Sequence, residues 1–329
     1  MEKYSQFRDK GSGISPFLPT TTPRSLMSKI LGAWIFILRL PIFILYCSAY
    51  FLVLDYLPLP AIMRKLLLWT LLAIPGIWWI DLQLDGVKRG SLSQQPPSRF
   101  PRERAVIAAQ FTSPVDAVYL ATIFDPIFVV SYPGTRKVQR VSLFRAMALA
   151  LAPPNPTVPR TTGLTDLRAL VEANPHRVIA VFPEMTTTNG KGILPLSPSL
   201  LATPADANIF PVSLRYTAPD ITTPVPGAWA SFLWNLLGRP THYIRVRLAE
   251  GVSNTTLAEN EEEQSDSEAE AEVWERSDGE EHLTSEEKRL LDHVGDSLAR
   301  LARNKRVGLT LKDKAAFVEA WNNKKGKRS

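Results

Sequence analysis

Cysteine and histidine are both scarce in this chain, which has one cysteine and four histidines among 329 residues. The single thiol, Cys47, excludes an intrachain disulfide and gives no sign of a fold that matures in an oxidising compartment. The sequence implies no metal and no redox cofactor.

Negative charge is concentrated in one stretch. Residues 259–281 contain 12 acidic side chains and one arginine, a net charge of −11. Because the whole chain has a net charge of +6, the other residues together carry +17. Low hydrophobicity gives that stretch no core, which predicts a disordered acidic insertion over 253–282. The basic remainder suits an anionic lipid surface and phosphate-bearing substrates. Nucleic acid is excluded as a partner because no stacking motif or recognition helix accompanies the charge.

Two apolar runs lie near the N-terminus. Ile30–Leu57 is 28 residues long, enough to cross about 30 Å of hydrocarbon, although it contains Arg39 and Pro41. The second run, Leu66–Ile80, is shorter, and its three tryptophans suit the headgroup level. We therefore predict a membrane hairpin over 28–82, either two passes or one monotopic insertion. A buried helical hairpin in a soluble protein is the competing interpretation.

The flanks of the predicted hairpin indicate its orientation. Both are rich in lysine and arginine, which favours a cytosolic position for each. Arg64 and Lys65 in the connecting turn argue against a full double pass. The first run starts too late and is too long for a signal peptide.

Polar strings follow two apolar segments that read as buried strands. Val178–Phe182 precedes Pro183, Glu184, Met185, three threonines, Asn189 and Gly190; Ala105–Ala109 precedes a string that ends at Asp116. Open α/β sheets bind ligands at the carboxyl ends of such strands. A turn-rich polar loop is the bland alternative for the first string. For the second string, Ser113, Pro114 and Asp116 also form an ordinary helix start.

Together the two strings resemble the motifs of the glycerolipid acyltransferase family. That family has His, four residues and Asp in its first motif and Phe-Pro-Glu-Gly-Thr in its third, roughly 70 residues later. The resemblance covers about residues 103–250. It implies an α/β fold with a mixed sheet flanked by helices and no cofactor beyond acyl-CoA as co-substrate. The implied reaction is acyl transfer from acyl-CoA to lysophosphatidic acid or a related lysophospholipid, giving phosphatidic acid.

The resemblance also assigns residues to the site. Asp116, Ser113 and Glu184 are the implied catalytic residues. The fourth motif corresponds to Ile209–Ser213, a predicted strand that carries the family's proline. The implied substrate-binding residues are Arg160, Pro183, Thr186, Thr187, Asn189, Gly190 and Pro211. For Arg160, a surface arginine in a proline-rich loop is the alternative interpretation.

The sequence differs from the family motifs at two positions. Phe111 occupies the position of the family histidine, which acts as general base, and Met185 occupies that of the motif-three glycine. None of the four histidines is a convincing substitute. Two mechanisms stay open: Asp116 or Glu184 takes the proton directly, or catalysis rests on positioning and on donors such as Thr112, Ser113 and the helix-start amides.

The remaining segments complete the predicted organisation. A disordered cytosolic N-terminus covers 1–27, a linker 83–102, the acyltransferase domain 103–252, and C-terminal helices with a basic tail 283–329. Thr284–Glu287 predicts a helix start. The tail resembles a dilysine retrieval signal, which favours the cytosolic face of the endoplasmic reticulum membrane, with the lipid droplet as a further location. The alternative function is a catalytically impaired family member that binds lipid or organises droplets, because Phe111 cannot accept a proton.

Overall fold

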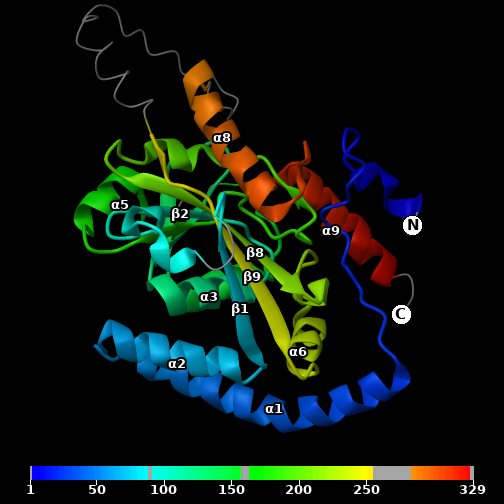
Figure 1. Cartoon of the computed structure of the whole chain (residues 1–329). Coiled ribbons are helices and arrows are strands. Elements are labelled where there is room, and N and C mark those ends of the chain that lie inside the picture. Colours follow the sequence, from blue (N-terminus) through cyan, green and yellow to red (C-terminus); the bar gives the residue numbers. More distant parts are fainter. Residues whose placement is uncertain (1, 88–90, 156, 158–162, 255–282, 327–329) are drawn as a thin grey trace, which may run out of the picture.

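The computed structural model describes residues 2–87, 91–155, 157, 163–254 and 283–326. Its centre is a nine-stranded mixed sheet with the order β1-β9-β8-β2-β6-β3-β4-β5, in which β10 pairs with β8 (Figure 1). The predicted mixed α/β sheet flanked by helices is therefore confirmed. The strands are β1 Ile77–Leu84, β2 Val106–Ala109, β3 Ile127–Ser131, β4 Val138–Val141, β5 Leu164–Thr165, β6 Ile179–Val181, β7 Gly192–Ile193, β8 Asn208–Thr217, β9 His242–Leu248, β10 Val252–Ser253 and β11 Lys305–Arg306.

Helices cover both faces of the sheet. One face packs against α2, α3, α4 and α6, whereas α5 and α8 pack on the other. The α-helices are α1 Leu26–Leu52, α2 Ala61–Ala73, α3 Pro114–Phe124, α4 Leu143–Leu149, α5 Leu167–Ala173, α6 Trp229–Leu237, α8 Ser285–Ala302 and α9 Leu311–Gly326. Short 3₁₀ helices lie at Glu2–Phe7, Leu54–Tyr56, Leu92–Gln94, Pro97–Arg99, Pro198–Ala202 and Pro219–Ile221.

Parallel pairing dominates the middle of the sheet. β2 pairs in parallel with β6 on one side and β8 on the other, and β6 pairs in parallel with β3. Every residue of β2 and β6 is buried, as expected for parallel strands covered on both faces. Because β2 and β6 are neighbours and run the same way, both polar strings emerge at one edge of the sheet.

The N-terminal residues are ordered, which corrects the predicted disorder of 1–27. Phe7 and Phe17 are buried against α9, where both rings lie within 6 Å of the Phe317 ring. Asp9 accepts hydrogen bonds from the backbone of Ser12 and of Gly308, which ties this segment to the start of α9. Burial of these apolar side chains thus offsets the conformational entropy that is lost when this segment becomes ordered, although its composition resembles that of a disordered tail.

The predicted hairpin over 28–82 is only partly helical. α1 is long and apolar enough to cross a membrane by length and composition, with mean hydropathy 2.2 over its best window and few buried residues. α2 has 13 residues and packs against α3. The end of the predicted hairpin is wrong, because Ile77–Leu84 forms β1, which pairs in parallel with β9.

The C-terminal helices belong to the globule. α8 begins at the predicted position, where Thr284 and Glu287 form a capping box. Its apolar positions Leu290, Val294 and Leu298 are buried against the sheet. The acidic insertion lies outside the described residues beyond Asn254, and so does the end of the basic tail.

Phe317 should be a main contributor to the ordering of the N-terminus. Its ring is fully buried and contacts Tyr4, Phe7, Phe17 and Trp321. We expect Phe317→Ala to lower the free energy of unfolding by about 3–5 kcal/mol and to make residues 2–25 susceptible to limited proteolysis. Glu319→Ala, an exposed position on the same helix, is the matched control. Wild-type protection of the N-terminus in Phe317→Ala would contradict this role.

Candidate active site at the carboxyl edge of the parallel strands

The loops that follow β2 and β6 lie side by side. Thr188 N donates to Phe111 O at 3.1 Å, which joins them directly. A third segment, after β8, closes the group: Thr223 N donates to Thr112 O at 2.8 Å, and Thr187 Oγ1 donates to Thr223 O at 2.6 Å. The two predicted motifs therefore share one location in the fold.

Asp116 is fully enclosed at the start of α3. Its Oδ2 accepts from the amides of Thr112 and Ser113 at 2.7 and 2.8 Å and from Thr112 Oγ1 at 3.0 Å. Its Oδ1 accepts from the Tyr216 hydroxyl. Burial raises the pKa of Asp116 to about 6, against these hydrogen bonds, which favour the charged form.

This network assigns the first motif a structural role. Ser113 and Asp116 form a capping box with Pro114 in the first turn, as the helix-start interpretation predicted. The amides of Thr112 and Ser113 are engaged by Asp116 and are not free to hold an oxyanion. Sequence reasoning missed Tyr216, which lies one hundred residues away and had no local signal.

Glu184 is equally buried but less well satisfied. Its Oε2 accepts from Leu194 N at 3.1 Å, whereas Oε1 makes no hydrogen bond of good geometry within the described residues. Burial raises the pKa of Glu184 to about 8, with smaller opposing effects from the amides of Leu194 and Phe111.

Lys314 reaches the same loop from α9. Its ammonium is fully buried and donates to Thr187 O at 2.6 Å and to Thr187 Oγ1 at 3.0 Å. Burial lowers the pKa of Lys314 to about 7, while the charge of Glu184 opposes that shift. The C-terminal helix thus holds the motif-three loop through a side chain that no motif indicated.

The two departures from the family motifs lie together. The Phe111 ring stacks on the Phe182 ring, with centroids 4.4 Å apart and planes inclined by 24°. Met185 has φ +58°, a left-handed conformation that a glycine adopts without cost. The backbone of the turn therefore keeps a glycine conformation although the residue has changed.

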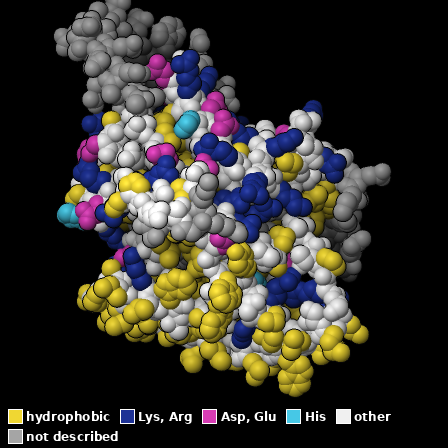
Figure 2. All heavy atoms as spheres, viewed as in Figure 1, with side chains coloured by type: hydrophobic (Ala, Val, Ile, Leu, Met, Phe, Trp, Pro, Cys, Tyr) yellow, Lys and Arg dark blue, Asp and Glu magenta, His cyan; other side chains and the backbone are white. Residues whose placement is uncertain are grey.

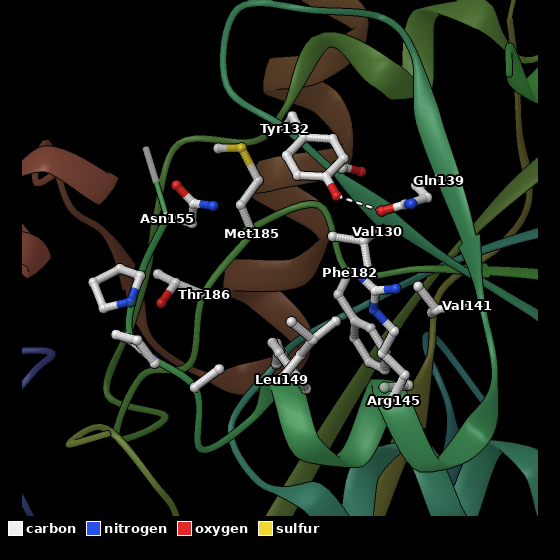
Figure 3. Close-up of a pocket in the computed structure, with 16 residues that line it drawn as sticks. Val130, Tyr132, Gln139, Val141, Arg145, Leu149, Asn155, Phe182, Met185 and Thr186 are labelled. Atoms are coloured by element: carbon white, nitrogen blue, oxygen red, sulfur yellow. Dashed lines mark hydrogen bonds between the residues drawn. The ribbon is translucent and has the colours of Figure 1, made fainter. Parts of the chain in front are cut away.

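A cavity of about 210 Å³ lies against this aromatic pair. Both motif loops contribute to its wall, through Phe111 and Phe182 and through Met185 and Thr186. Met185 and Asn155 lie on one side of the cavity, with Arg145 and Gln139 on the other (Figure 3). The remaining wall is mainly apolar and comes from β3, β4, α4 and residues 152–154. Tyr132 donates to Gln139 Oε1 at 2.7 Å, and Asn155 Oδ1 accepts from Thr157 Oγ1 at 2.7 Å. Arg145, Thr186 and the amide nitrogen of Asn155 are the polar groups of this wall that we consider for contact with a ligand.

The other predicted site residues have mixed positions. Asn189 Nδ2 donates to Ser15 O and Leu18 O, which anchors the N-terminal segment. Gly190 has φ +71° and closes the turn. Pro183 ends β6 and Pro211 lies within β8, and neither lines the cavity. Arg160 lies outside the described residues.

No histidine of the described residues lines the cavity, and His282 lies outside them. The His242 ring is buried and bonded to Leu236 O at 2.7 Å, and His176 is exposed beside Glu103. Within the described ranges, no group of three or more His, Cys, Asp or Glu side chains is placed to hold a metal ion.

Sequence comparison connects the chain to lipid acyltransferases. It is 29% identical over 261 residues to a Schizosaccharomyces pombe protein named "Putative lysophosphatidic acid:oleoyl-CoA acyltransferase", covering 76% of this chain and 84% of the relative. It is 26% identical over 210 residues to Saccharomyces cerevisiae lysophosphatidic acid:oleoyl-CoA acyltransferase 1, covering 60% and 61%. These relatives confirm the predicted resemblance to that family. No family model and no solved structure matches the chain.

The raised pKa of Glu184 predicts how stability depends on pH. The folded chain binds this proton more tightly than the unfolded chain, whose glutamate has the ordinary value of 4.5. The free energy of unfolding should therefore fall as pH rises from about 5 to about 8. Glu184→Gln should remove most of that fall, as measured by denaturant unfolding across this range. Glu172→Gln, an exposed glutamate on α5, should keep it; an unchanged profile in Glu184→Gln would contradict the assignment.

Proposed function

We propose that the chain is a membrane-bound acyltransferase that moves a fatty acyl group from acyl-CoA to lysophosphatidic acid. In this reaction the acceptor hydroxyl attacks the thioester carbonyl, a C–O bond forms and the C–S bond breaks. The hydroxyl proton ends on the CoA sulfur, and the products are phosphatidic acid and free CoA. One observation carries the proposal: residues of both motif loops line a single, largely apolar cavity, in a chain related to proteins named for this activity.

The geometry favours catalysis by positioning over a carboxylate base. Asp116 has both oxygens engaged, and neither Asp116 nor Glu184 lines the cavity. Phe111 places a ring where an imidazole would stand, so the proton passes to the departing thiolate without a histidine relay. Thr186, Asn155 and Arg145 orient the reactants from the cavity wall. The stacked ring of Phe111 excludes water from the reacting carbonyl.

The membrane attachment that we propose is monotopic. The start of α1 packs on the end of α6 so closely that a β-carbon at Gly32 would lie 2.6 Å from Gly238 O. In the middle, Arg39 donates to Arg239 O at 2.5 Å and to Pro240 O at 2.9 Å. Near its end, Tyr46 donates to Leu67 O at 2.9 Å. A helix bonded to one globule along its length lies across that globule and cannot leave it to span a bilayer.

The outer side of α1 is well suited to lipid. Hydrophobic side chains gather over α1 and α2 at the base of the molecule (Figure 2). Trp34, Leu38 and Leu45 are each about two-thirds exposed or more. Arg39, the charge that would be costly in hydrocarbon, faces backbone carbonyls of the protein. We assign this face to the cytosolic leaflet of the endoplasmic reticulum, with the lipid droplet as a further site, in phospholipid and triacylglycerol synthesis.

A second candidate function is supported by the aromatic pair. With Phe111 stacked on Phe182 and Asp116 enclosed, the cavity resembles a binding site as much as a reactive one. A family member that binds lipid without transferring acyl groups, or that organises droplets, would retain all of these contacts.

An assay of acyl transfer distinguishes the enzyme from the lipid-binding protein. Microsomes that contain the protein should transfer label from oleoyl-CoA to lysophosphatidic acid well above microsomes without it. A panel of other lysophospholipids tests the acceptor. Background transfer to every acceptor would reject the enzyme and favour the binding role.

Phe111→His tests whether the site depends on the aromatic pair. We expect transfer to fall by about tenfold or more, because a buried imidazole would lose the stack and find Asp116 already bound to Tyr216. Phe111→Leu, which keeps the position apolar, should retain more activity than Phe111→His. A sharp rise in Phe111→His would instead indicate chemistry that needs a general base.

Labelling of introduced cysteines tests the monotopic attachment. Both ends of α1 join the same globule, so a cysteine placed at Leu59 in a Cys47→Ser background should react with an impermeant reagent in intact, cytosol-out microsomes. Cysteines at Lys10 and Arg303, both exposed positions, are the controls and should react equally. Protection of position 59 until the membrane is permeabilised would indicate a two-pass hairpin.

A further inference from the structure

A second cavity lies at the same edge of the sheet, on the opposite face. Its volume is about 100 Å³, the scale of one phosphate group. Alternation in the residues that follow β2 separates the two cavities: Phe111 lines the first, whereas Gln110 and Thr112 line the second. Lining residues are Gln110, Thr112, Asn189–Lys191, Ser213–Tyr216, Pro219, Thr222, Ala302 and Asn304. No aspartate or glutamate is among them.

Gln110 brings an unused donor to this cavity. The residue is 1% exposed, and its Oε1 accepts from Ser213 Oγ at 2.5 Å. Its Nε2 is buried and has no hydrogen-bond partner within the described part of the chain. A buried amide donor without a partner is costly, so a ligand that accepts a hydrogen bond here would remove that cost.

One arginine lines this cavity, and others are its neighbours in the sheet. Arg215 lines it and pairs in register with Arg245, while Ser213 pairs with Arg247. The end of α8 holds two of them, since Arg215 donates to Ala302 O at 3.4 Å and Arg247 to Leu301 O at 2.6 Å. Basic side chains cover the molecule where the end of α8 meets β8 and β9 (Figure 2).

The cluster carries an excess of positive charge. Arg303 joins these three arginines, because the charges of Arg303, Arg245 and Arg215 all lower the pKa of Arg247, after a larger effect of burial. Among the described residues, Asp81 is the carboxylate that pairs with the cluster, through Arg245 Nε at 3.1 Å. Four guanidinium groups beside one carboxylate repel one another, and a polyanion would relieve that repulsion.

We propose that this cavity and its arginines bind a phosphate group of a phosphorylated substrate. Assigning the group to a substrate rests on the proposed function; the anion site itself does not. Two sources share the chemistry, the phosphates of CoA and the headgroup of the lysophospholipid. The site faces away from the lipid-exposed helices, because α8 lies on the other side of the sheet from α1 and α2 (Figure 1). A water-soluble phosphate reaches this face without crossing the membrane surface.

The decisive measurement is calorimetric binding to the full chain in detergent micelles. The probes are CoA, 3′-dephospho-CoA and sn-glycerol 3-phosphate. Arg215→Gln should weaken at least one of them about ten- to hundred-fold, with Arg215→Lys intermediate. Arg289→Gln, an exposed arginine of α8 away from the cavity, is the matched control and should bind as wild type. Affinity should also fall as salt is raised.

The pattern across probes identifies the source. Sensitivity of CoA alone assigns the 3′-phosphate, sensitivity of both CoA forms assigns the pyrophosphate, and sensitivity of glycerol phosphate assigns the headgroup. Gln110→Glu, which adds a negative charge inside the cavity, should weaken the same probe; thermal unfolding confirms that each variant is folded. Wild-type affinity of Arg215→Gln for every probe would overturn the site. Sensitive binding without acyl transfer would overturn the proposed function and leave the site standing.

Discussion

Parallel pairing of β2 with β6 is the constraint on which the rest of the molecule depends. It brings two strings seventy residues apart to one edge, and it fixes which side chains face each side of the sheet. Residues from other elements then hold the loops at that edge in place. Tyr216 of β8 closes the Asp116 network, Lys314 of α9 holds the loop after β6, and Asn189 anchors the N-terminal segment. Many of the polar residues that resemble a substrate-binding loop in the sequence therefore make hydrogen bonds that connect these segments to one another.

The two faces of the sheet differ in chemistry at this edge. On one face, apolar side chains and a stacked aromatic pair enclose the cavity that both motifs share. On the other face, a smaller cavity is lined by Arg215 and by Gln110, whose amide nitrogen has no hydrogen-bond partner among the described residues. Gln110 and Phe111, the two residues directly after β2, line different cavities, so two consecutive residues produce this difference.

Local patterns predicted the elements well and the long-range contacts poorly. The strands β2, β6 and β8, the cap of α3 and the start of α8 follow from short apolar runs and capping residues, and the structure has them at those positions. Hydropathy could not distinguish the apolar helix α1 from the strand Ile77–Leu84, because an apolar strand and an apolar helix share composition. Tyr216, Lys314 and Arg215 had no signal, since their roles depend on partners that only the fold brings near. The N-terminal segment looked like a tail because its two buried phenylalanines are isolated in sequence.

The monotopic attachment that we propose for α1 has a consequence for the kind of surface that the protein can occupy. A helix that rests its outer side in lipid while its inner side stays bonded to the globule displaces acyl chains from one leaflet alone. It therefore needs no second leaflet beneath it, and a single phospholipid layer over an oil phase offers the same hydrocarbon depth. Such a wedge also expands the layer that it enters, which favours outwardly curved surfaces over flat ones.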